Sequence, residues 1–325
     1  MPTRRSLAVL AALAPFAAAR AQAPSWPDRT VRAMVPFGPG GAIDILIRVL
    51  APHFPAQANG QSLVVENRPG AGGTIGAAQV AAARPDGTTL LMAELASAAL
   101  AHELYRDLPY DPRRSFTPVI FLADLPMLLV ANANLPLRDM AGVIARARSP
   151  NGLSYASVGT GHISHLTMER LRMAAGDGAR MLHVVYRSGA ENMAAVARGD
   201  VDVAVTSLSS AAGFLQQGAI RAIAVTTAAP IEALPGVPPM AATVPGLTAT
   251  LWYGLVGPAG MGPEVTARAN AAFNAILALP EVRDTLRRQQ GADIIGGPPE
   301  RFAAHIRDEI ARWTPVIRGA GIRVE

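Results

Sequence analysis

Two residue types that carry much of protein chemistry are missing from this chain of 325 residues. It has no cysteine, which excludes disulfide bonds, thiol catalysis, thiolate metal sites and lipid attachment at a cysteine after an export signal. It has no lysine either, so all 29 basic residues are arginine. A Schiff-base lysine and a phosphate-loop lysine are therefore excluded as well.

Long hydrophobic runs are also scarce, and the first one lies at the N-terminus. Arg4 and Arg5 precede an apolar run over Leu7–Ala19, and small residues follow in an Ala-x-Ala pattern at Ala21–Ala23. This arrangement predicts an export signal that is cleaved after about Ala23. The run is shorter than the ~20 residues that a membrane-spanning helix needs, although a retained N-terminal anchor is the alternative.

The charge balance is only mildly basic. The formal net charge of +5 falls to about +2 when Arg4, Arg5 and Arg20 of the predicted signal are set aside. No basic stripe interleaved with aromatic residues occurs in the sequence, so nucleic acid is not an expected partner. Half of the residues in the full sequence are hydrophobic. A mature chain of about 300 residues is long enough for two domains.

Strand-like and helix-like segments alternate along most of the chain. The predicted strand over 30–37 leads directly into a predicted helix over 42–54, and a second series begins near residue 127. A proline-rich loop over 229–246 separates that series from a strand at 251–260 and two terminal helices. The pattern predicts an α/β protein with two lobes. The expected division is a signal peptide at 1–23, lobe 1 at 24–126, lobe 2 at 127–249 and the C-terminal part of lobe 1 at 250–325.

A glycine-rich elbow joins the first predicted strand to the first predicted helix. Gly38, Pro39, Gly40 and Gly41 stand between them, so the N-terminus of the helix is aimed out of the elbow. Free N–H groups and the positive end of the helix dipole predict an anion site there; a tight turn without a ligand is the alternative. Glycine permits close approach and left-handed dihedrals, so a side chain at Gly41 is expected to block the ligand. Asp44 either balances the helix dipole or accepts a hydrogen bond from the ligand.

A second glycine-rich turn, Asn67–Gly76, also leads into a predicted helix. Backbone N–H groups from Ala71 and Gly72 onward are candidates to face the same ligand. The alternative is a loop that needs Gly70 and Gly73 only because its backbone has positive φ angles.

The segment Tyr155–Leu166 repeats the same design in the second series. A predicted strand ends at Ser157, and Gly159, Thr160 and Gly161 form a turn before the next helix. The two hydroxyls and the free N–H groups of this turn are expected to hold a second carboxylate. We therefore predict a cleft between two lobes with one elbow on each side.

These elbows belong to a series of landmarks that stand in a fixed order. They are "PFGPGGAID" (36–44), "VVENRPGAGGTIGAAQVA" (64–81), "PDGTTLL" (85–91), "LPYDPRRSFTPV" (108–119), "YASVGTGHISHL" (155–166), "ALPGVPPMAATVPG" (233–246), "WYGLVGPAG" (252–260) and "GGPPERFAAHIRDEIARW" (296–313). Together they closely resemble the Bug-type periplasmic solute receptors of tripartite tricarboxylate transporters. The resemblance covers essentially the whole mature chain.

The resemblance implies a type II periplasmic binding protein fold with a ligand cleft between two α/β lobes. It implies a periplasmic receptor, expected to be a monomer, that binds a di- or tricarboxylate or a related small organic acid without metal or cofactor. The receptor would deliver its ligand to a membrane permease. The residues that match the ligand-bordering loop of the family are Phe37, Gly38, Pro39, Gly40, Gly41 and Asp44.

Departures from the family pattern lie in the second lobe. Tyr186 and Arg187 match it, but Glu191 stands where relatives commonly have proline. If Glu191 faces the cleft, it disfavours a second carboxylate; otherwise it only complements a helix dipole. Thr206 stands where an aspartate is common, so an amine-binding contact does not carry over. The identity of the ligand stays open for these reasons.

Three other functions compete with the receptor. His162, His165 and Glu169 lie at helical spacings of three and four, which suits a metal site but lacks further ligands. An exported hydrolase would use Ser157 or Ser164 with His165, although no Gly-x-Ser-x-Gly elbow is present. His165 is more simply interpreted as a packing and hydrogen-bonding residue beneath its loop. A sensor that docks on a receptor kinase would need the same cleft as the transport receptor.

Overall fold

The computed structural model describes residues 26–324 of the chain. The predicted signal peptide at 1–23 lies outside the described residues. Within the described part, no helix combines the length and the apolar character needed to cross a membrane.

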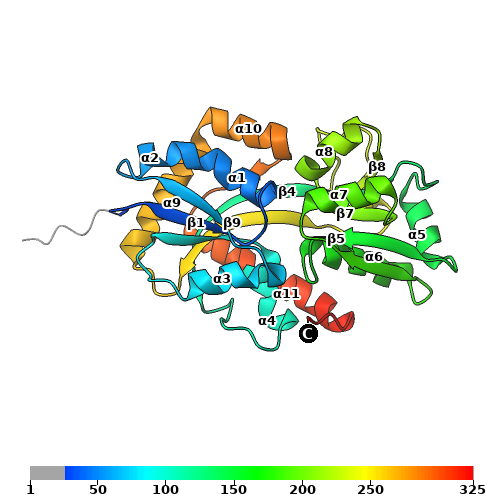
Figure 1. The fold of residues 1–325 in the computed structure, drawn as a ribbon, viewed down its shortest axis with the longest axis horizontal. Coiled ribbons are helices and arrows are strands. Elements are labelled where there is room, and N and C mark those ends of the chain that lie inside the picture. Colours follow the sequence, from blue (N-terminus) through cyan, green and yellow to red (C-terminus); the bar gives the residue numbers. More distant parts are fainter. Residues whose placement is uncertain (1–25, 325) are drawn as a thin grey trace, which may run out of the picture.

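A ten-stranded mixed β-sheet runs through the centre of the molecule (Figure 1). Its strand order is β2-β1-β3-β9-β4-β7-β5-β6, and β8 and β10 also pair with β4. Most strands are short, apolar and followed by a helix, which is the pattern the alternating sequence predicts. The strands are β1 (Val31–Val35), β2 (Leu63–Asn67), β3 (Thr89–Ala93), β4 (Phe116–Asn132), β5 (Leu153–Ser157), β6 (Met181–Val185), β7 (Val203–Ser207), β8 (Ile220–Val225), β9 (Thr250–Pro258) and β10 (Asp293–Ile294).

Strand β4, with 17 residues, connects the two halves of this sheet. Its part up to Pro126 pairs with β9, and its part from Met127 onward pairs with β7 and β8. We call the half with β1, β2, β3 and β9 the first lobe, and the half with β5 to β8 the second lobe. The sequence did not reveal that one strand serves both lobes. The exact boundaries, 126/127 and 249/250, stay a prediction.

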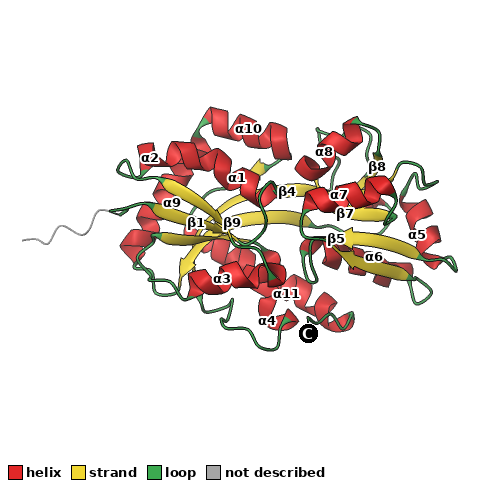
Figure 2. Ribbon diagram, in the orientation of Figure 1, coloured by secondary structure: helices red, strands yellow, loops and turns green. Residues whose placement is uncertain are grey.

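Helices cover both faces of the sheet in each lobe (Figure 2). Large aromatic side chains fill the core of the first lobe, and Trp252, Trp313, Phe54 and Phe273 are fully buried there. The first lobe contains α1 (Ala42–Leu50), α2 (Phe54–Gln57), α3 (Thr74–Ala81), α4 (Ala101–Leu104), α9 (Pro263–Ala278), α10 (Pro280–Gln290) and α11 (Pro299–Gly319). The second lobe contains α5 (Met140–Arg148), α6 (Ile163–Ala175), α7 (Gly189–Arg198) and α8 (Leu208–Gln216).

The direction of the strands decides where the site forms. Strand β1 of the first lobe is parallel to β2 and β3, and β5 of the second lobe is parallel to β6 and β7. Carboxyl ends of parallel strands meet at one edge of a sheet, and the helices that follow begin there. In this protein, the helices that follow β1, β5, β6 and β7 all begin beside one cavity.

Candidate ligand-binding site

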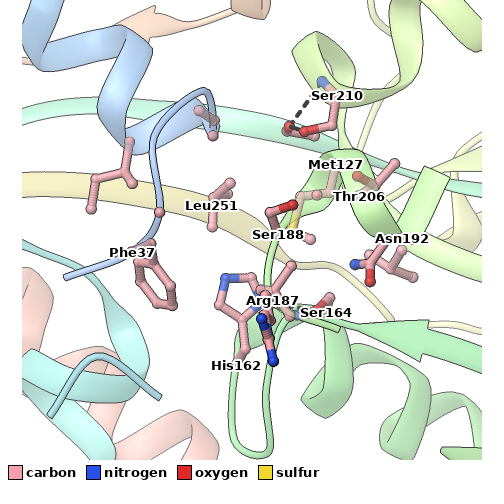
Figure 3. A pocket seen from close by; sticks show the side chains of 18 of the residues that line it. Phe37, Met127, His162, Ser164, Arg187, Ser188, Asn192, Thr206, Ser210 and Leu251 are labelled. Carbon is pink, nitrogen blue, oxygen red and sulfur yellow. Dashed lines mark hydrogen bonds between the residues drawn. The ribbon is translucent and has the colours of Figure 1, made fainter. Parts of the chain in front are cut away.

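A cavity lies between the two lobes, and the centre of a water molecule can reach about 60 Å³ of it. That is several times the roughly 10–15 Å³ that one water needs, so a small molecule has room. Figure 3 shows Phe37 on one side and Ser188, Asn192 and Thr206 on the other. The lining residues are Phe37, Gly38, Gly41, Ala42, Ile43, Met127, Val158, His162, Ser164, Arg187, Ser188, Gly189, Asn192, Val205, Thr206, Ser207, Ser210, Leu251 and Tyr253.

Four helices begin at the cavity wall. Their N-cap residues, Gly41 of α1, His162 of α6, Ser188 of α7 and Ser207 of α8, all line it. The three side-chain caps each accept a hydrogen bond from an N–H of their own helix, at 3.2–3.3 Å. The positive ends of four helix dipoles therefore converge on one small space, which favours an anionic ligand.

The two lobes contribute opposite chemistry to the wall. Phe37, Ile43 and Leu251 make the first-lobe wall largely apolar, whereas hydroxyls, an amide and an imidazole dominate the second-lobe wall. Arg187, at the rim, is exposed and forms no ion pair within residues 26–324. No aspartate or glutamate of the described chain lines the cavity. Arg187 is therefore the one charged side chain among the described wall residues, since His162 is neutral.

The first-lobe elbow is held together by Asp44, which is 2 % exposed. Its carboxylate accepts hydrogen bonds from the N–H of Gly40, from Arg48 Nε and from Asn67 Nδ2, each at 2.9 Å. Asn67 also donates to the carbonyl oxygen of Phe37 at 3.0 Å. Burial alone raises the pKa of Asp44, but these hydrogen bonds outweigh it and lower the pKa below its ordinary value. Asp44 thus holds the elbow in place through these hydrogen bonds and does not itself line the cavity.

The backbone angles at Gly41 do not require glycine, contrary to the expectation from the sequence. Its φ of −80° is open to any residue, and the left-handed dihedral falls on Gly40, at φ +80°. A Cβ on Gly41 would find only the carbonyl oxygen of Gly38, at 4.0 Å. The left-handed dihedral belongs to Gly40, so the expectation that Gly41 needs one is wrong. A side chain at Gly41 would instead occupy the cavity itself.

The second-lobe elbow is held by imidazoles instead of a carboxylate. Ser157 Oγ contacts His183 Nε2 and also accepts a hydrogen bond from the N–H of Gly159. His165 Nδ1 accepts the N–H of Gly161 at 3.0 Å, which confirms that His165 supports its loop. Gly161 itself has φ +80°, so glycine is required at that position.

Burial keeps these imidazoles neutral. His165 and His183 stack with ring centroids 4.0 Å apart. Burial, and then the proximity of His183 and His162, lower the pKa of His165 to about 3. Burial alone lowers the pKa of His162 to about 4, and burial also lowers that of His183. At neutral pH the second elbow therefore offers dipoles and N–H groups but no formal charge of its own.

The Asn67–Gly76 turn faces the second-lobe elbow. A Cβ on Gly159 would come within 4.0 Å of the Cα of Gly72, and the carbonyl oxygen of Ala71 accepts a hydrogen bond from Tyr105 Oη at 2.7 Å. Gly70 and Gly73 have φ of +132° and +92°, which confirms that the loop uses them for positive φ. The backbones of Gly72 and Gly159 therefore bring the two lobes close together at this point.

Residues considered for metal binding or hydrolysis have other partners. Glu169 accepts hydrogen bonds from Tyr155 Oη and Arg172 Nε, both at 2.8 Å. His162 Nδ1 pairs with Ser164 Oγ at 2.8 Å. Neither serine pairs with His165, the partner that the hydrolase hypothesis required. In the described part of the chain, no group of three histidine, aspartate or glutamate side chains is arranged to hold a metal ion.

The predicted site residues fall into two groups. Those on the cavity wall are Phe37, Gly38, Gly41, Arg187 and Thr206. The other predicted residues do not line it: Pro39, Gly40, Asp44, Ala71, Gly72, Ser157, Gly159, Thr160, Gly161 and Tyr186. Glu191 is exposed and accepts the N–H of Arg187 at 3.0 Å, so it complements the start of α7 and stays out of the cavity.

Sequence reasoning missed several wall residues, above all Ser188, Asn192, Ser207 and Ser210. Part of this set had a local signal, because Ser188 followed three residues later by Glu191 is a capping pattern that marks a helix start. Asn192 had none, since only the packing of its helix decides which way it faces.

Two α/β lobes built on one mixed β-sheet, with a cavity between them, are the architecture of periplasmic binding proteins. Comparison with known sequences agrees: residues 46–322 match the model of the tripartite tricarboxylate transporter family receptors. The chain belongs to this family, which confirms the resemblance seen in the sequence.

Individual relatives cover nearly the whole chain. A Pseudomonas sp. (strain P51) protein encoded between tcbD and tcbE is 35 % identical over 97 % of this chain and 93 % of its own length. BugT of Bordetella pertussis is 30 % identical over 95 % and 94 %.

Two solved structures are similar as well. Rpa4515 of R. palustris, solved with adipate, is 34 % identical, with a TM-score of 0.86 over 92 % of this chain and 100 % of its own. MatC of Rhodopseudomonas palustris, solved with malate, is 30 % identical, with a TM-score of 0.83 over 90 % and 100 %.

Proposed function

We propose that this protein is a periplasmic receptor that captures a small organic acid in the cavity between its lobes and delivers it to a membrane permease. We further propose that it acts as a monomer and changes nothing in its ligand. The observation that carries the proposal is the convergence of four helix N-termini on a cavity wall that bears Arg187 and, among residues 26–324, no acidic residue.

Two similar proteins support the ligand class, since one was solved with adipate and the other with malate. Both are small carboxylates, and a dicarboxylate can place one end at the elbows and the other near Arg187. The first-lobe wall contacts the carbon skeleton, and the second-lobe wall contributes most of the polar contacts. The family supports a permease as the partner.

The test is a thermal-shift screen of the mature chain against dicarboxylates, tricarboxylates, amino acids and aromatic acids, followed by calorimetry. A ligand at a hundred times its Kd adds about 2.7 kcal/mol of stability. We expect at least one acid to stabilise the protein and to be recovered unchanged after hours of incubation. Failure of every acid in the screen to stabilise the protein, or turnover of the acid, would contradict the proposal.

A further inference from the structure

One side chain on the cavity wall is buried without a partner. Asn192, at the end of the first turn of α7, is 1 % exposed and lines the cavity. Its Oδ1 is enclosed and accepts no hydrogen bond from residues 26–324. The amide nitrogen, Nδ2, has no partner in that part of the chain either, and Figure 3 shows it turned toward Ser188 and the space between the walls. The atom of Asn192 that a ligand can reach is therefore a hydrogen-bond donor.

A second buried asparagine, at the other end of the same helix, shows what such a nitrogen normally meets. Asn132 is 4 % exposed, and its Nδ2 donates to the carbonyl oxygens of Val196 and Ala197 at 2.7 and 3.0 Å. Buried polar groups nearly always have such partners, because an unpaired one loses its bonds to water without replacement. An acceptor for Nδ2 of Asn192 must come from a molecule in the cavity, since the described chain offers none.

The helix that carries Asn192 also presents free N–H groups. The first N–H groups of a helix have no acceptor within it, and α7 begins at Gly189. Ser188 accepts the N–H of Glu191 with its Oγ at 3.2 Å and that of Asn192 with its carbonyl oxygen at 3.1 Å. The N–H groups of Gly189 and Ala190 have no backbone partner within residues 26–324, and Gly189 lines the cavity. One turn of helix thus combines a free N-terminus with an unpaired amide nitrogen.

The charged groups at this helix start favour an anion in the cavity. Glu191 is exposed, accepts the N–H of Arg187 at 3.0 Å and does not line the cavity, so it does not disfavour a second carboxylate there. The Arg187 side chain does line it. A hydroxyl is close as well, because a Cβ on Gly189 would come within 3.8 Å of Thr206 Oγ1.

We propose that Asn192 Nδ2 and the free N–H groups at the start of α7 form the subsite for a second carboxylate, so that the receptor selects diacids over monoacids of the same shape. This inference rests on the proposed receptor function. Because Nδ2 only donates, the group that it meets must be an acceptor, and the helix N-terminus adds a preference for negative charge. A carboxylate meets both requirements. The subsite replaces the one expected at the Gly159–Gly161 turn, whose residues do not line the cavity.

The experiment compares acids of one shape that differ at the second end. Calorimetry on the mature chain would use succinate, its monoamide succinamate, and 4-methylpentanoate, in which an isopropyl group replaces one carboxylate. Adipate, adipamate and 6-methylheptanoate form the longer series. Nδ2 can donate to a carboxylate or an amide carbonyl but not to an isopropyl group. In the series that binds, we expect the diacid to bind more than about 100-fold tighter than the branched monoacid, with the monoamide between them, because charge-assisted hydrogen bonds are the strongest.

Two variants of Asn192 test the role of its nitrogen. Asn192→Leu removes the donor at similar size, so it should weaken the diacid about tenfold and change the branched monoacid by no more than about twofold. Asn192→Asp replaces the donor by an anion, so the monoamide, whose NH₂ group can donate to it, should now bind tighter than the diacid.

Stability separates this role from a structural one. Asn192→Leu should not lower the Tm, because the amide that it removes has no hydrogen bond within the described chain to lose. Asn132→Leu is the matched control, since it removes a bonded amide at the opposite end of α7. It should lower the Tm and leave the order of the acids unchanged.

The outcomes distinguish this inference from the function on which it rests. If no acid of the screen or of these series binds, the receptor proposal and the inference fall together. If monoacids bind the parent as tightly as diacids or better, only the inference is overturned. The same holds if Asn192→Leu keeps the full preference of the parent, which would place the second carboxylate elsewhere on the wall.

Discussion

The two strand-to-helix elbows beside the cavity can be compared directly. The β1–α1 elbow is tied by the buried carboxylate of Asp44, which collects three hydrogen bonds from Gly40, Arg48 and Asn67. The β5–α6 elbow is tied by neutral imidazoles, with His165 accepting the N–H of Gly161. Both leave a helix N-terminus at the cavity, but one uses an ionised group and the other uses uncharged ones.

The difference shows two ways in which an elbow beside the proposed anion site is stabilised. Asp44 is an anion close to the proposed anion site, but its charge is compensated by Arg48 and by hydrogen bonds from Gly40 and Asn67. The histidines need no such compensation, because burial keeps them neutral. Positive potential in the cavity therefore comes from helix dipoles and from Arg187, and the following variants test each part.

The largest effect is expected for Gly41→Val, at the first elbow. It places three carbon atoms in a small cavity at an unstrained φ, so binding of the best acid from the screen should fall more than about 100-fold. The Tm should change by no more than a few degrees. Gly178→Val, at an exposed and open position outside the cavity, is the control. Unchanged calorimetric affinity would mean that the ligand does not contact this elbow.

Arg187→Ala tests the second-lobe wall and should have a smaller effect. The guanidinium is exposed and screened by solvent, so we expect about a tenfold loss of affinity, with a weaker dependence on salt than the parent shows. Arg180→Ala, at the opposite end of β6, is the matched control. If Arg187→Ala abolishes binding while Gly41→Val binds normally, a side-chain ion pair holds the ligand and the first elbow is merely a turn.

His165→Asn tests the second elbow through the pH dependence of stability. The unfolded state binds a proton near pH 6.5, whereas the folded pKa of His165 is about 3, so stability must fall as pH drops below 6.5. At pH 5 this single histidine costs roughly 2 kcal/mol. Asparagine keeps an acceptor for Gly161 without titrating, so the Tm of the variant should fall by a few degrees less than that of the parent between pH 7 and pH 5. If the Tm of the parent and of the variant fell equally between pH 7 and pH 5, His165 would not be held neutral in the folded protein.

The smallest effect is expected for Asp44→Asn, because Arg48 is half exposed and its ion pair is partly screened. The folded pKa of Asp44 lies below its unfolded value of 3.8, so its stabilisation is present above pH 3.8 and is lost as pH falls through the folded pKa. The parent should therefore lose Tm more steeply than the variant below pH 4. Asp177→Asn, at an exposed position, controls for the loss of one charge. Equal slopes would show that Asp44 does not hold the elbow by its charge.

Much of the fold could be predicted because its signals are local. Alternation of short apolar strands with amphipathic helices indicated an α/β protein, and the change of partners within β4 falls where the second series was expected to begin. Gly70 and Gly73 were candidates for positive φ because glycine alone adopts it cheaply. The single long strand was missed, since its two halves look like separate strands in the sequence.

The sequence by itself determined that lysine is absent, that glycine-rich elbows precede helices, and to which family the chain belongs. Only the tertiary structure decided that Ser188 and Ser207 cap helices at the same cavity as Gly41, that Asn192 turns its amide into it, and that Asp44 is enclosed by Arg48 and Asn67. The physical reason is distance along the chain. Turn dihedrals and helix caps depend on a few neighbouring residues, whereas a cavity wall is made by residues more than 150 positions apart that meet only when both lobes have folded.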